Sequence, residues 1–332
     1  MSDAPPTPIA HYNLLEPIGG GGLGEVFRAR DTKVGRTVAL KLVDPRIEAS
    51  PALLSRLLED ARAAAGLSHP NIATLWDVGE GSGRHYLAYE FIAGHSLREE
   101  ARGSLHPRRA LDLAVQIADA IAEGHAHGIL HGDLRPDTIF VTAKGSAKVL
   151  DFGMGYWTNG GAIRADAAEA PDRLASDSIA VLAYMSPEQA LGGAVDARTD
   201  VFSLGTLTYE LVTGQNPFAA GTPGDTLLNV TQARFVPPSD VNAAVPKDLD
   251  PILSHALTPD IESRQQSAAA FAAELRSVAA MMDVRAGETE APRPSALLPI
   301  DDTPDRQAAG LLWTALIAAA AVAGLIWWLL SR

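Results

Sequence analysis

Two stretches of the sequence give the strongest indication of the fold: HGDLRPDT at residues 131–138 and DFG at residues 151–153. The residues between them hold two short apolar runs separated by a Lys-Gly turn, a pattern typical of a β-hairpin. In such a hairpin Asp133 precedes the first strand and Asp151 follows the second, so both carboxylates fall at one end. Two acids there suit a general base and a metal ligand, although each alone is also an ordinary turn residue.

The composition bounds what the chain can do. Its 332 residues are 47% apolar, which is enough to bury a globular core. The 27 basic and 40 acidic residues give a net charge of −13, which argues against a nucleic-acid-binding face. The sequence has no cysteine, which excludes disulfides and thiolate metal sites. Residues 1–11 lack the basic-then-apolar pattern of a signal peptide, and we expect them to be disordered.

A glycine-rich segment runs from Ile18 to Phe27 and spells G-x-G-x-x-G-x-V. Glycines let backbone N–H groups approach a phosphate closely. The same letters occur in flexible turns and in dinucleotide-binding fingerprints, but such a fingerprint opens a helix. Here extended runs follow, the second ending in Val38-Ala39-Leu40-Lys41. The pattern therefore favours a glycine-rich lid over a nucleotide, with Lys41 as a candidate phosphate ligand.

Taken in order, these motifs resemble those of the bacterial members of the eukaryotic-type (Hanks-type) serine/threonine protein kinases. That family carries a glycine-rich loop, a V-A-I-K lysine, an H-R-D-L-K-x-x-N loop and D-F-G. The resemblance covers roughly Tyr12 to Met282 and implies a bilobal α+β fold. A small β-rich N-lobe would occupy residues 12–92 and a large helical C-lobe residues 93–282. The resemblance also implies ATP with Mg²⁺ or Mn²⁺ as cofactors and a protein as substrate or partner.

The resemblance assigns a nucleotide and phosphoryl-transfer site. Asp133 would be the catalytic base, with Arg135 in place of the catalytic-loop lysine and Lys41 on the phosphates. Asp151 would hold the metal, with Thr138 as a second ligand. The nucleotide-binding residues would be Ile18, Gly19, Gly20, Gly21, Gly22, Leu23, Gly24, Glu25, Val26 and Lys41, with backbone groups of Glu90 and Ile92 on the adenine and Tyr89 behind it.

The same resemblance implies structural roles for four further residues. Asp60, on a predicted helix, would pair with Lys41, as a glutamate does in the family. Asp200 would tie down the catalytic loop. Glu188, in Ser186-Pro187-Glu188, would pair with Arg264.

Five positions depart from the family pattern, namely Gly132 for Arg, Arg135 for Lys, Thr138 for Asn, Val181 for Thr and Asp60 for Glu. Arginine at the first of these positions reads phosphorylation of the activation loop in the family, so Gly132 argues against that switch. Two functions stay open. One is a kinase that transfers the γ-phosphate of ATP to protein hydroxyls, and the other is a pseudokinase that binds nucleotide or partners as a scaffold. A small-molecule kinase is a more distant third, because the Ser186-to-Gly205 region resembles protein kinases more closely.

The segment between DFG and Ser186 corresponds to the activation loop. It is acidic, and its charged residues include Asp166, Glu169, Asp172 and Asp177. If this loop touches a substrate, the sequence predicts a basic partner.

The C-terminal part of the chain changes character. Residues 283–310 are rich in proline and acids and read as a disordered linker. The uncharged run at 311–330 is long enough, at about 1.5 Å per residue, to cross the roughly 30 Å of a bilayer core. Trp313 and Trp327 lie near its ends, where interfacial aromatic residues belong. A buried helix is the alternative. The prediction is a single-pass C-terminal anchor in the cell membrane, with the kinase domain in the cytoplasm because it needs ATP.

Overall fold

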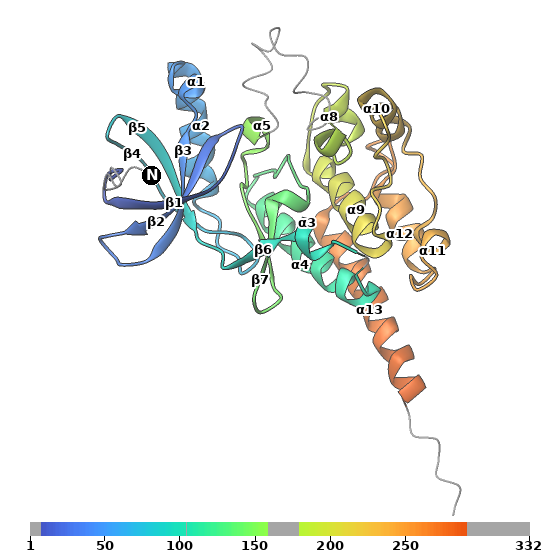
Figure 1. The fold of residues 1–332 in the computed structure, drawn as a ribbon. Coiled ribbons are helices and arrows are strands. Elements are labelled where there is room, and N and C mark those ends of the chain that lie inside the picture. The colour runs from blue at the N-terminus through green and yellow to red at the C-terminus, as the bar shows by residue number, and fades with distance from the viewer. Residues whose placement is uncertain (1–7, 104, 159–178, 291–332) are drawn as a thin grey trace, which may run out of the picture. The chain divides into compact units, whose positions relative to one another are not determined.

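The computed structural model describes residues 8–103, 105–158 and 179–290. Its contacts divide the chain into two units, Met1–Arg285 and Ala286–Arg332. In the first unit a β-sheet lobe is followed along the chain by a helical lobe (Figure 1). This confirms the bilobal α+β architecture that the resemblance implied.

The N-lobe is built on a five-stranded antiparallel sheet with strand order β1-β2-β3-β5-β4. Its elements are β1 (Tyr12–Gly21), β2 (Gly24–Asp31), β3 (Thr37–Val43), α1 (Pro45–Glu48), α2 (Pro51–Ala64), β4 (Leu75–Gly81) and β5 (Arg84–Glu90). Strand β3 contributes side chains to both faces of the sheet, because successive side chains of a strand point to opposite sides. Leu40 packs into one apolar cluster with Tyr12 and Tyr86, whereas Val43 packs into another with Leu57 of α2.

Helix α2 begins where its sequence carries start signals. The Ser50 side chain accepts a hydrogen bond from the Leu53 N–H, and Pro51 occupies the first helical position. Leu57 and Ala61 are fully buried against the sheet. The helix is thereby fixed along one side of the lobe, where it contacts β4.

The C-lobe is mainly helical and carries a small three-stranded sheet of order β6-β7-β8. Its elements are β6 (Gly94–Ser96), α3 (Leu97–Glu100), α4 (Pro107–Ala126), η1 (Pro136–Thr138), β7 (Ile139–Thr142), β8 (Ala147–Val149), α5 (Gly155–Thr158), α8 (Pro187–Ala190), α9 (Ala197–Thr213), α10 (Pro223–Gln232), α11 (Pro238–Val241), α12 (Leu249–Ala256) and α13 (Ala268–Glu290). Helices α4 and α9 cross in the centre of this lobe (Figure 1) and bury Ile117, Ile121 and Leu204. The predicted hairpin is confirmed as β7 paired with β8, with Ile139 opposite Val149.

Both ends of the predicted domain are more ordered than the sequence suggested. The expectation of disorder over residues 1–11 is wrong for residues 8–11, because Ile9 is buried and the carbonyl of Pro8 accepts a hydrogen bond from Ser82. The linker expected from residue 283 is also wrong in its first part, because α13 continues to Glu290. No proline interrupts that helix before Pro292, and Asp283 forms an ion pair with Arg108 of α4.

The rest of the predicted linker and the predicted membrane span at 311–330 lie outside the described residues. Within residues 8–290, apart from the gaps, no helix is long and apolar enough to cross a bilayer.

Candidate active site

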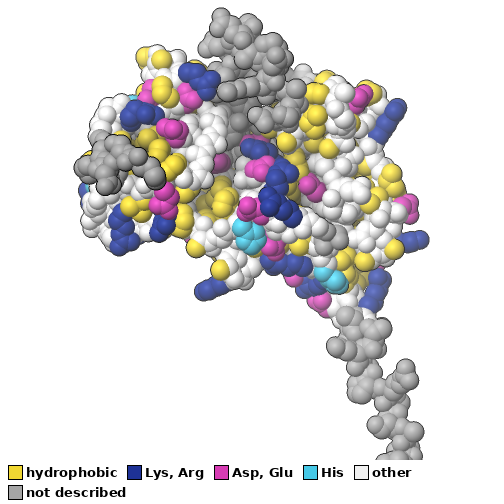
Figure 2. All heavy atoms as spheres, in the orientation of Figure 1, with side chains coloured by type: hydrophobic (Ala, Val, Ile, Leu, Met, Phe, Trp, Pro, Cys, Tyr) yellow, Lys and Arg dark blue, Asp and Glu magenta, His cyan; other side chains and the backbone are white. Residues whose placement is uncertain are grey.

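A cavity of about 530 Å³ lies between the glycine-rich strands, the segment after β5 and the loop that ends in Asp151. Figure 2 shows apolar side chains, in yellow, where the two lobes meet. The predicted nucleotide-binding residues that line this cavity are Ile18, Gly19, Gly20, Gly21, Gly22, Leu23, Gly24, Val26, Lys41, Glu90 and Ile92. Glu25 is absent from this lining, because strand alternation turns its side chain away from that of Val26. The volume is that of a small-molecule site.

The glycine-rich loop is a tight connection between β1 and β2, which pair up to Gly21 and Gly24. Gly24 has a φ of +128°, and a Cβ atom there would lie 1.9 Å from the carbonyl oxygen of Leu42. Only glycine therefore fits. At the tip, the Leu23 side chain is buried and its carbonyl accepts a 2.8 Å hydrogen bond from the N–H of Asp44. The loop is thus anchored at its tip to the end of β3.

Lys41 and Asp151 meet across the cavity. The Lys41 Nζ donates to Asp151 Oδ1 at 2.7 Å, and both side chains are largely buried. Asp151 has a φ of +56°, a conformation that costs a non-glycine residue energy and is found at functional sites. The next residue, Phe152, turns into the C-lobe core and packs edge-on against His131 at 5.1 Å between ring centroids. This alternation aims the Asp151 carboxylate at the cavity.

Tyr89 forms the back of the cavity beside this ion pair. Lys41 Nζ lies 5.6 Å from the centre of its ring. Burial, and to a lesser extent the negative charge of Asp151, raises the pKa of the Tyr89 hydroxyl well above its usual value. Among the described residues this hydroxyl has no hydrogen-bond partner.

The expected pair between Asp60 and Lys41 is not what the structure shows. Asp60 Oδ2 instead accepts a 2.9 Å hydrogen bond from the indole Nε1 of Trp157, which lies in α5. Trp157 is fully buried and packs with Leu57 and Ala61 of helix α2. The buried indole N–H needs an acceptor, and Asp60 supplies it while Lys41 is neutralised by Asp151.

Asp200 of α9 binds the backbone of the catalytic loop, the segment that contains His131, Gly132 and Asp133. One carboxylate oxygen accepts the backbone N–H of His131 and the ring of His125, both at 2.8 Å, and the other accepts the N–H of Gly132 at 2.8 Å. Burial alone would raise the pKa of Asp200, but these bonds, led by the one from His125, lower it. The structure thus places Asp200 where the resemblance expected it, under the loop that carries Asp133.

His131 connects this loop to the segment before Asp151. Its Nδ1 accepts the backbone N–H of Asp133 at 3.2 Å, so Nε2 is the donor to the carbonyl of Leu150 at 2.9 Å. The carbonyl of Thr138 accepts the N–H of Leu150 at 2.8 Å. These bonds bring the two ends of the β7–β8 hairpin together, as the sequence predicted.

Arg135 and Thr138 occupy the positions where the family has Lys and Asn. Arg135 lines the cavity, and its Nε donates to Asp133 Oδ1 at 3.1 Å. The Thr138 hydroxyl is buried and faces the loop backbone, 3.0 Å from the carbonyl oxygens of both Asp133 and Arg135. It also accepts the Arg135 N–H at 3.2 Å. The hydroxyl is therefore engaged in shaping the loop, with its hydrogen directed to the loop backbone.

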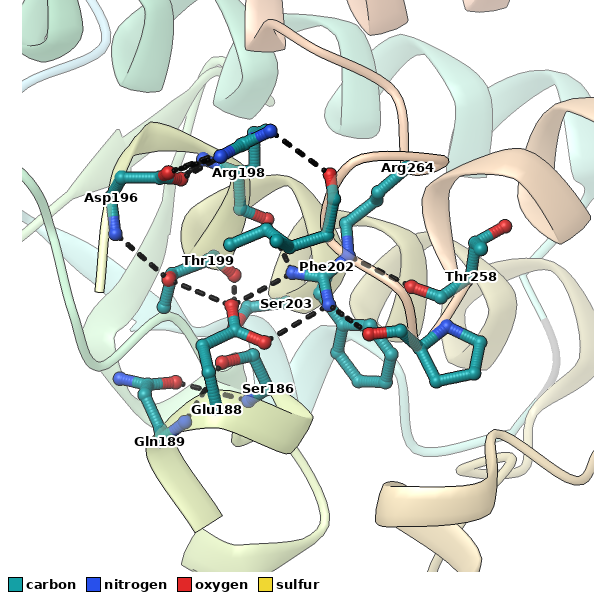
Figure 3. Close-up of polar contacts among 12 residues, drawn as sticks. Ser186, Glu188, Gln189, Asp196, Arg198, Thr199, Phe202, Ser203, Thr258 and Arg264 are labelled. Carbon is teal, nitrogen blue, oxygen red and sulfur yellow. Dashed lines mark hydrogen bonds and ion pairs between the residues drawn. The ribbon is translucent and has the colours of Figure 1, made fainter. Parts of the chain in front are cut away.

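Glu188 and Arg264 form a bidentate ion pair in the C-lobe, shown in Figure 3. The two N–O distances are 2.8 and 3.0 Å, and Arg264 is fully buried. Glu188 also accepts a bond from the Thr199 hydroxyl at 2.8 Å. Burial alone would raise the pKa of Glu188, but Arg264 lowers it. The pair fixes α8 to the loop before α13.

Three features of the site were missed by sequence reasoning. Gln189 donates to the carbonyl of Gly132 at 2.8 Å and so joins α8 to the catalytic loop. Trp157 lies against α2, and Arg98 forms a bidentate pair with Asp137 at the cavity. The DFG and catalytic-loop motifs locate this neighbourhood, but no spacing in the sequence reveals the partners.

The fold and the arrangement of the cavity are those of a protein kinase, and the comparison with known families agrees. A model described as "Protein kinase domain" matches residues 12–275. The chain belongs to this family.

Its relatives are bacterial serine/threonine kinases. It is 32% identical over 277 residues to serine/threonine-protein kinase PknB of Mycobacterium leprae, covering 82% of this chain and 43% of that protein. A probable serine/threonine-protein kinase of Clostridium perfringens is 32% identical over 270 residues, covering 80% of this chain and 38% of that protein. The chain thus spans less than half the length of these curated relatives.

Among solved structures, the kinase domain of Mycobacterium tuberculosis PknI matches with a TM-score of 0.63 at 23% identity. The match covers 83% of this chain and 100% of that domain. At this identity the likeness supports the fold alone.

Proposed function

We propose that this protein is a membrane-tethered serine/threonine protein kinase that transfers the γ-phosphate of ATP to protein hydroxyls. The observation that carries the proposal is the meeting of a cation and a carboxylate, Lys41 and Asp151, inside one nucleotide-sized cavity. The glycine-rich backbone forms the roof of that cavity. Phosphoryl transfer depends on such positioned charges more than on covalent chemistry.

The residues divide the work as follows. Lys41 and the glycine-rich loop bind the phosphates, and the backbone at Glu90 and Ile92 binds the adenine. Asp133 accepts the proton of the substrate hydroxyl. Arg135 holds the Asp133 carboxylate in place through its 3.1 Å bond and adds a positive charge at the cavity wall.

The donor set fits a magnesium ion that is shared with a nucleotide. Among the described residues, no group of three or more His, Cys, Asp or Glu side chains gathers to hold a metal by itself. Mg²⁺ bound with nucleotides commonly uses one or two carboxylates, phosphate oxygens and water. Asp151 supplies such a carboxylate, and the bound ion would neutralise charge on the phosphates. Binding would exchange the Lys41–Asp151 pair for a cation on Asp151 and an anion on Lys41.

A pseudokinase is the second candidate, and two observations favour it. The Thr138 hydroxyl is engaged by the loop backbone, and Asp60 is bonded to Trp157 rather than to Lys41. Neither arrangement impairs nucleotide binding through Lys41 and Asp151. A pseudokinase that binds nucleotide would therefore differ from the kinase in turnover and not in affinity for ATP.

Nucleotide binding is tested by thermal unfolding of the full chain in detergent, with and without ATP and Mg²⁺. Saturating ATP at about 100 times Kd should stabilise the wild type by roughly 2.7 kcal/mol, because it binds only the folded state. Lys41→Met and Asp151→Asn should lose most of this stabilisation. The matched control is Arg102→Ala, which removes an exposed arginine outside the cavity lining. A folded wild type that millimolar ATP does not stabilise would contradict the proposal.

The membrane tether is supported by the uncharged run at 311–330. We expect the full chain to stay with the membrane fraction after an alkaline carbonate wash. Ala319→Lys combined with Val322→Lys should release it, because each lysine at the centre of a span costs about 3 kcal/mol. Equal retention of both proteins would show that the run does not anchor the chain.

A further inference from the structure

Four charged side chains form a chain of contacts that alternates in sign, in the order Asp133, Arg135, Asp137 and Arg98, and its two middle members line the cavity. Arg135 donates through Nε to Asp133 at 3.1 Å and through Nη1 to Asp137 at 2.8 Å, so one guanidinium bridges both carboxylates. Arg98, in α3, then binds Asp137 with Nε at 2.6 Å and Nη2 at 2.7 Å. In Figure 2, dark blue and magenta side chains lie intermixed beside β6 and α3.

A second acid lies behind this chain of charges. Glu210 of α9 accepts the hydroxyl of Tyr184, and burial raises the pKa of Glu210. The Asp137 carboxylate raises the pKa of the Arg98 guanidinium, and Tyr184 and Glu210 add to that effect. The planar, two-pronged contact with Asp137 is the geometry with which an arginine recognises a carboxylate.

The carboxylate of Asp137 lies close to Asp133, the proposed catalytic base. Because a single guanidinium spans Asp133 and Asp137, the two carboxylates are separated by no more than the width of that group and its two hydrogen bonds. Consecutive residues of an extended peptide are about 3.8 Å apart at their Cα atoms. A substrate whose hydroxyl reaches Asp133 would thus bring the side chain of a residue two or three positions away to Asp137.

We propose that Arg98 occupies, from within the chain, a subsite that would otherwise bind a basic side chain of the substrate. Arg98 is then a specificity-determining residue, and it removes selection for lysine or arginine near the accepting hydroxyl. The inference rests on the proposed function, in which Asp133 is the base. It also departs from the basic partner that the acidic loop sequence predicted, because the acids next to Asp133 are already matched by arginines.

The test uses two fluorescent peptides that share a central serine and differ only at the second and third positions on either side of it. One peptide carries arginine at those positions and the other glutamine. Affinities are measured by fluorescence anisotropy, and phosphorylation rates with ATP and Mg²⁺, on the full chain in detergent. The variants are Arg98→Ala, Arg98→Gln as a second replacement that keeps more of the side chain, Arg98→Ala with Asp137→Asn, and Arg102→Ala. The last removes an exposed arginine just after the end of α3 as a matched charge control.

We expect the wild type and Arg102→Ala to bind both peptides equally within about twofold. Arg98→Ala and Arg98→Gln should raise the preference for the arginine peptide about five- to tenfold, the effect of a partly buried charge-assisted pair. Adding Asp137→Asn should abolish the gain. An unchanged preference in either folded Arg98 variant would overturn the inference. So would a gain that survives Asp137→Asn, an equal gain in Arg102→Ala, or a strong arginine preference in the wild type.

The two readouts separate this inference from the proposed function. If no variant phosphorylates either peptide, the proposed function fails, and the ratio of affinities still decides whether Arg98 fills an acidic subsite. If phosphorylation occurs without a change in preference, the inference fails and the kinase stands.

Discussion

The ion pair of Glu188 and Arg264 shows what one pair of residues contributes to the fold. Arg264 is fully buried and also donates to the carbonyls of Thr258, Arg198 and Pro259, so its guanidinium is surrounded by acceptors. Removing the carboxylate would leave that charge without its counter-ion. Breaking a buried pair in this way is strongly destabilising, commonly by 3–5 kcal/mol.

The pair also gives stability a pH dependence of known sign. Because Arg264 lowers the folded-state pKa of Glu188, the pair stabilises the fold above the usual carboxyl pKa and loses that effect as the pH falls through the lowered value. Glu188→Gln keeps an amide oxygen that can accept one bond from Arg264, so it should be less stable than the wild type by about 2 kcal/mol at pH 7, below the full cost of breaking the pair. The gap should narrow towards pH 4 and below, as Glu188 becomes protonated. Urea unfolding across this range measures it, and a constant gap would show that the charge of Glu188 is not involved.

Asp60 gives a second prediction at this scale. Its bond to Trp157 implies that Asp60→Ala lowers the free energy of unfolding by about 1–3 kcal/mol, because the buried indole N–H loses its acceptor. ATP affinity should change less than twofold, because Asp60 is bonded to Trp157 and not to Lys41. Trp157→Phe should lose the same hydrogen bond, so that adding Asp60→Ala to it costs little more. Full additivity of the two losses, or a large loss of ATP affinity, would favour the Lys41–Asp60 pair instead.

At the scale of elements, the glycine-rich loop contains a glycine that an alanine cannot replace and another that it can. Gly24→Ala would place a Cβ 1.9 Å from a backbone oxygen at a φ of +128°, and we expect it to cost about 3 kcal/mol or more. Gly21→Ala meets nothing within 4 Å and should stay within about 0.5 kcal/mol of the wild type. Thermal unfolding of both variants without nucleotide is the measurement. Equal stability of the two would mean that the β1–β2 turn is not held as the structure shows it.

The elements also show how far the sequence can be followed. The β7–β8 hairpin and the strands β2 and β3 were predictable, because alternating apolar residues and turn signals are local. The partner of Lys41 was not, because it depends on how α2 and α5 lie against each other. One buried side chain, Trp157, binds the carboxylate of Asp60, which the family resemblance had paired with Lys41. Arg98 and Asp137 were missed for the same reason, since their contact joins two segments through tertiary structure.

The ends of the domain were misjudged for a different reason. Composition described residues 283–290 as linker, but no proline interrupts α13 there, and Asp283 gains a partner in Arg108. Ile9 was assigned to a disordered terminus, yet it fills a place in the N-lobe cluster with Tyr12 and Tyr86. In both cases a contact with a residue distant in sequence, Arg108 for Asp283 and Tyr86 for Ile9, contributes to the local structure.

At the scale of the whole molecule, the site exists only because two lobes contribute to it. Lys41 comes from the sheet of the N-lobe and Asp151 from the loop after β8, and their 2.7 Å ion pair joins the two lobes at the cavity. A nucleotide with its metal ion would bind to both. This coupling is why ATP is expected to stabilise the molecule as a unit.

Phosphate transfer is the most direct test of the central claim. The full chain in detergent is incubated with γ-labelled ATP, Mg²⁺ or Mn²⁺ and a serine-containing protein, beside Asp133→Asn. The account predicts that the wild type places phosphate on serine or threonine hydroxyls. The rate should be at least 100-fold lower in Asp133→Asn, while ATP still stabilises both proteins. A folded wild type that ATP stabilises but that transfers no phosphate, or a variant as active as the wild type, would contradict it.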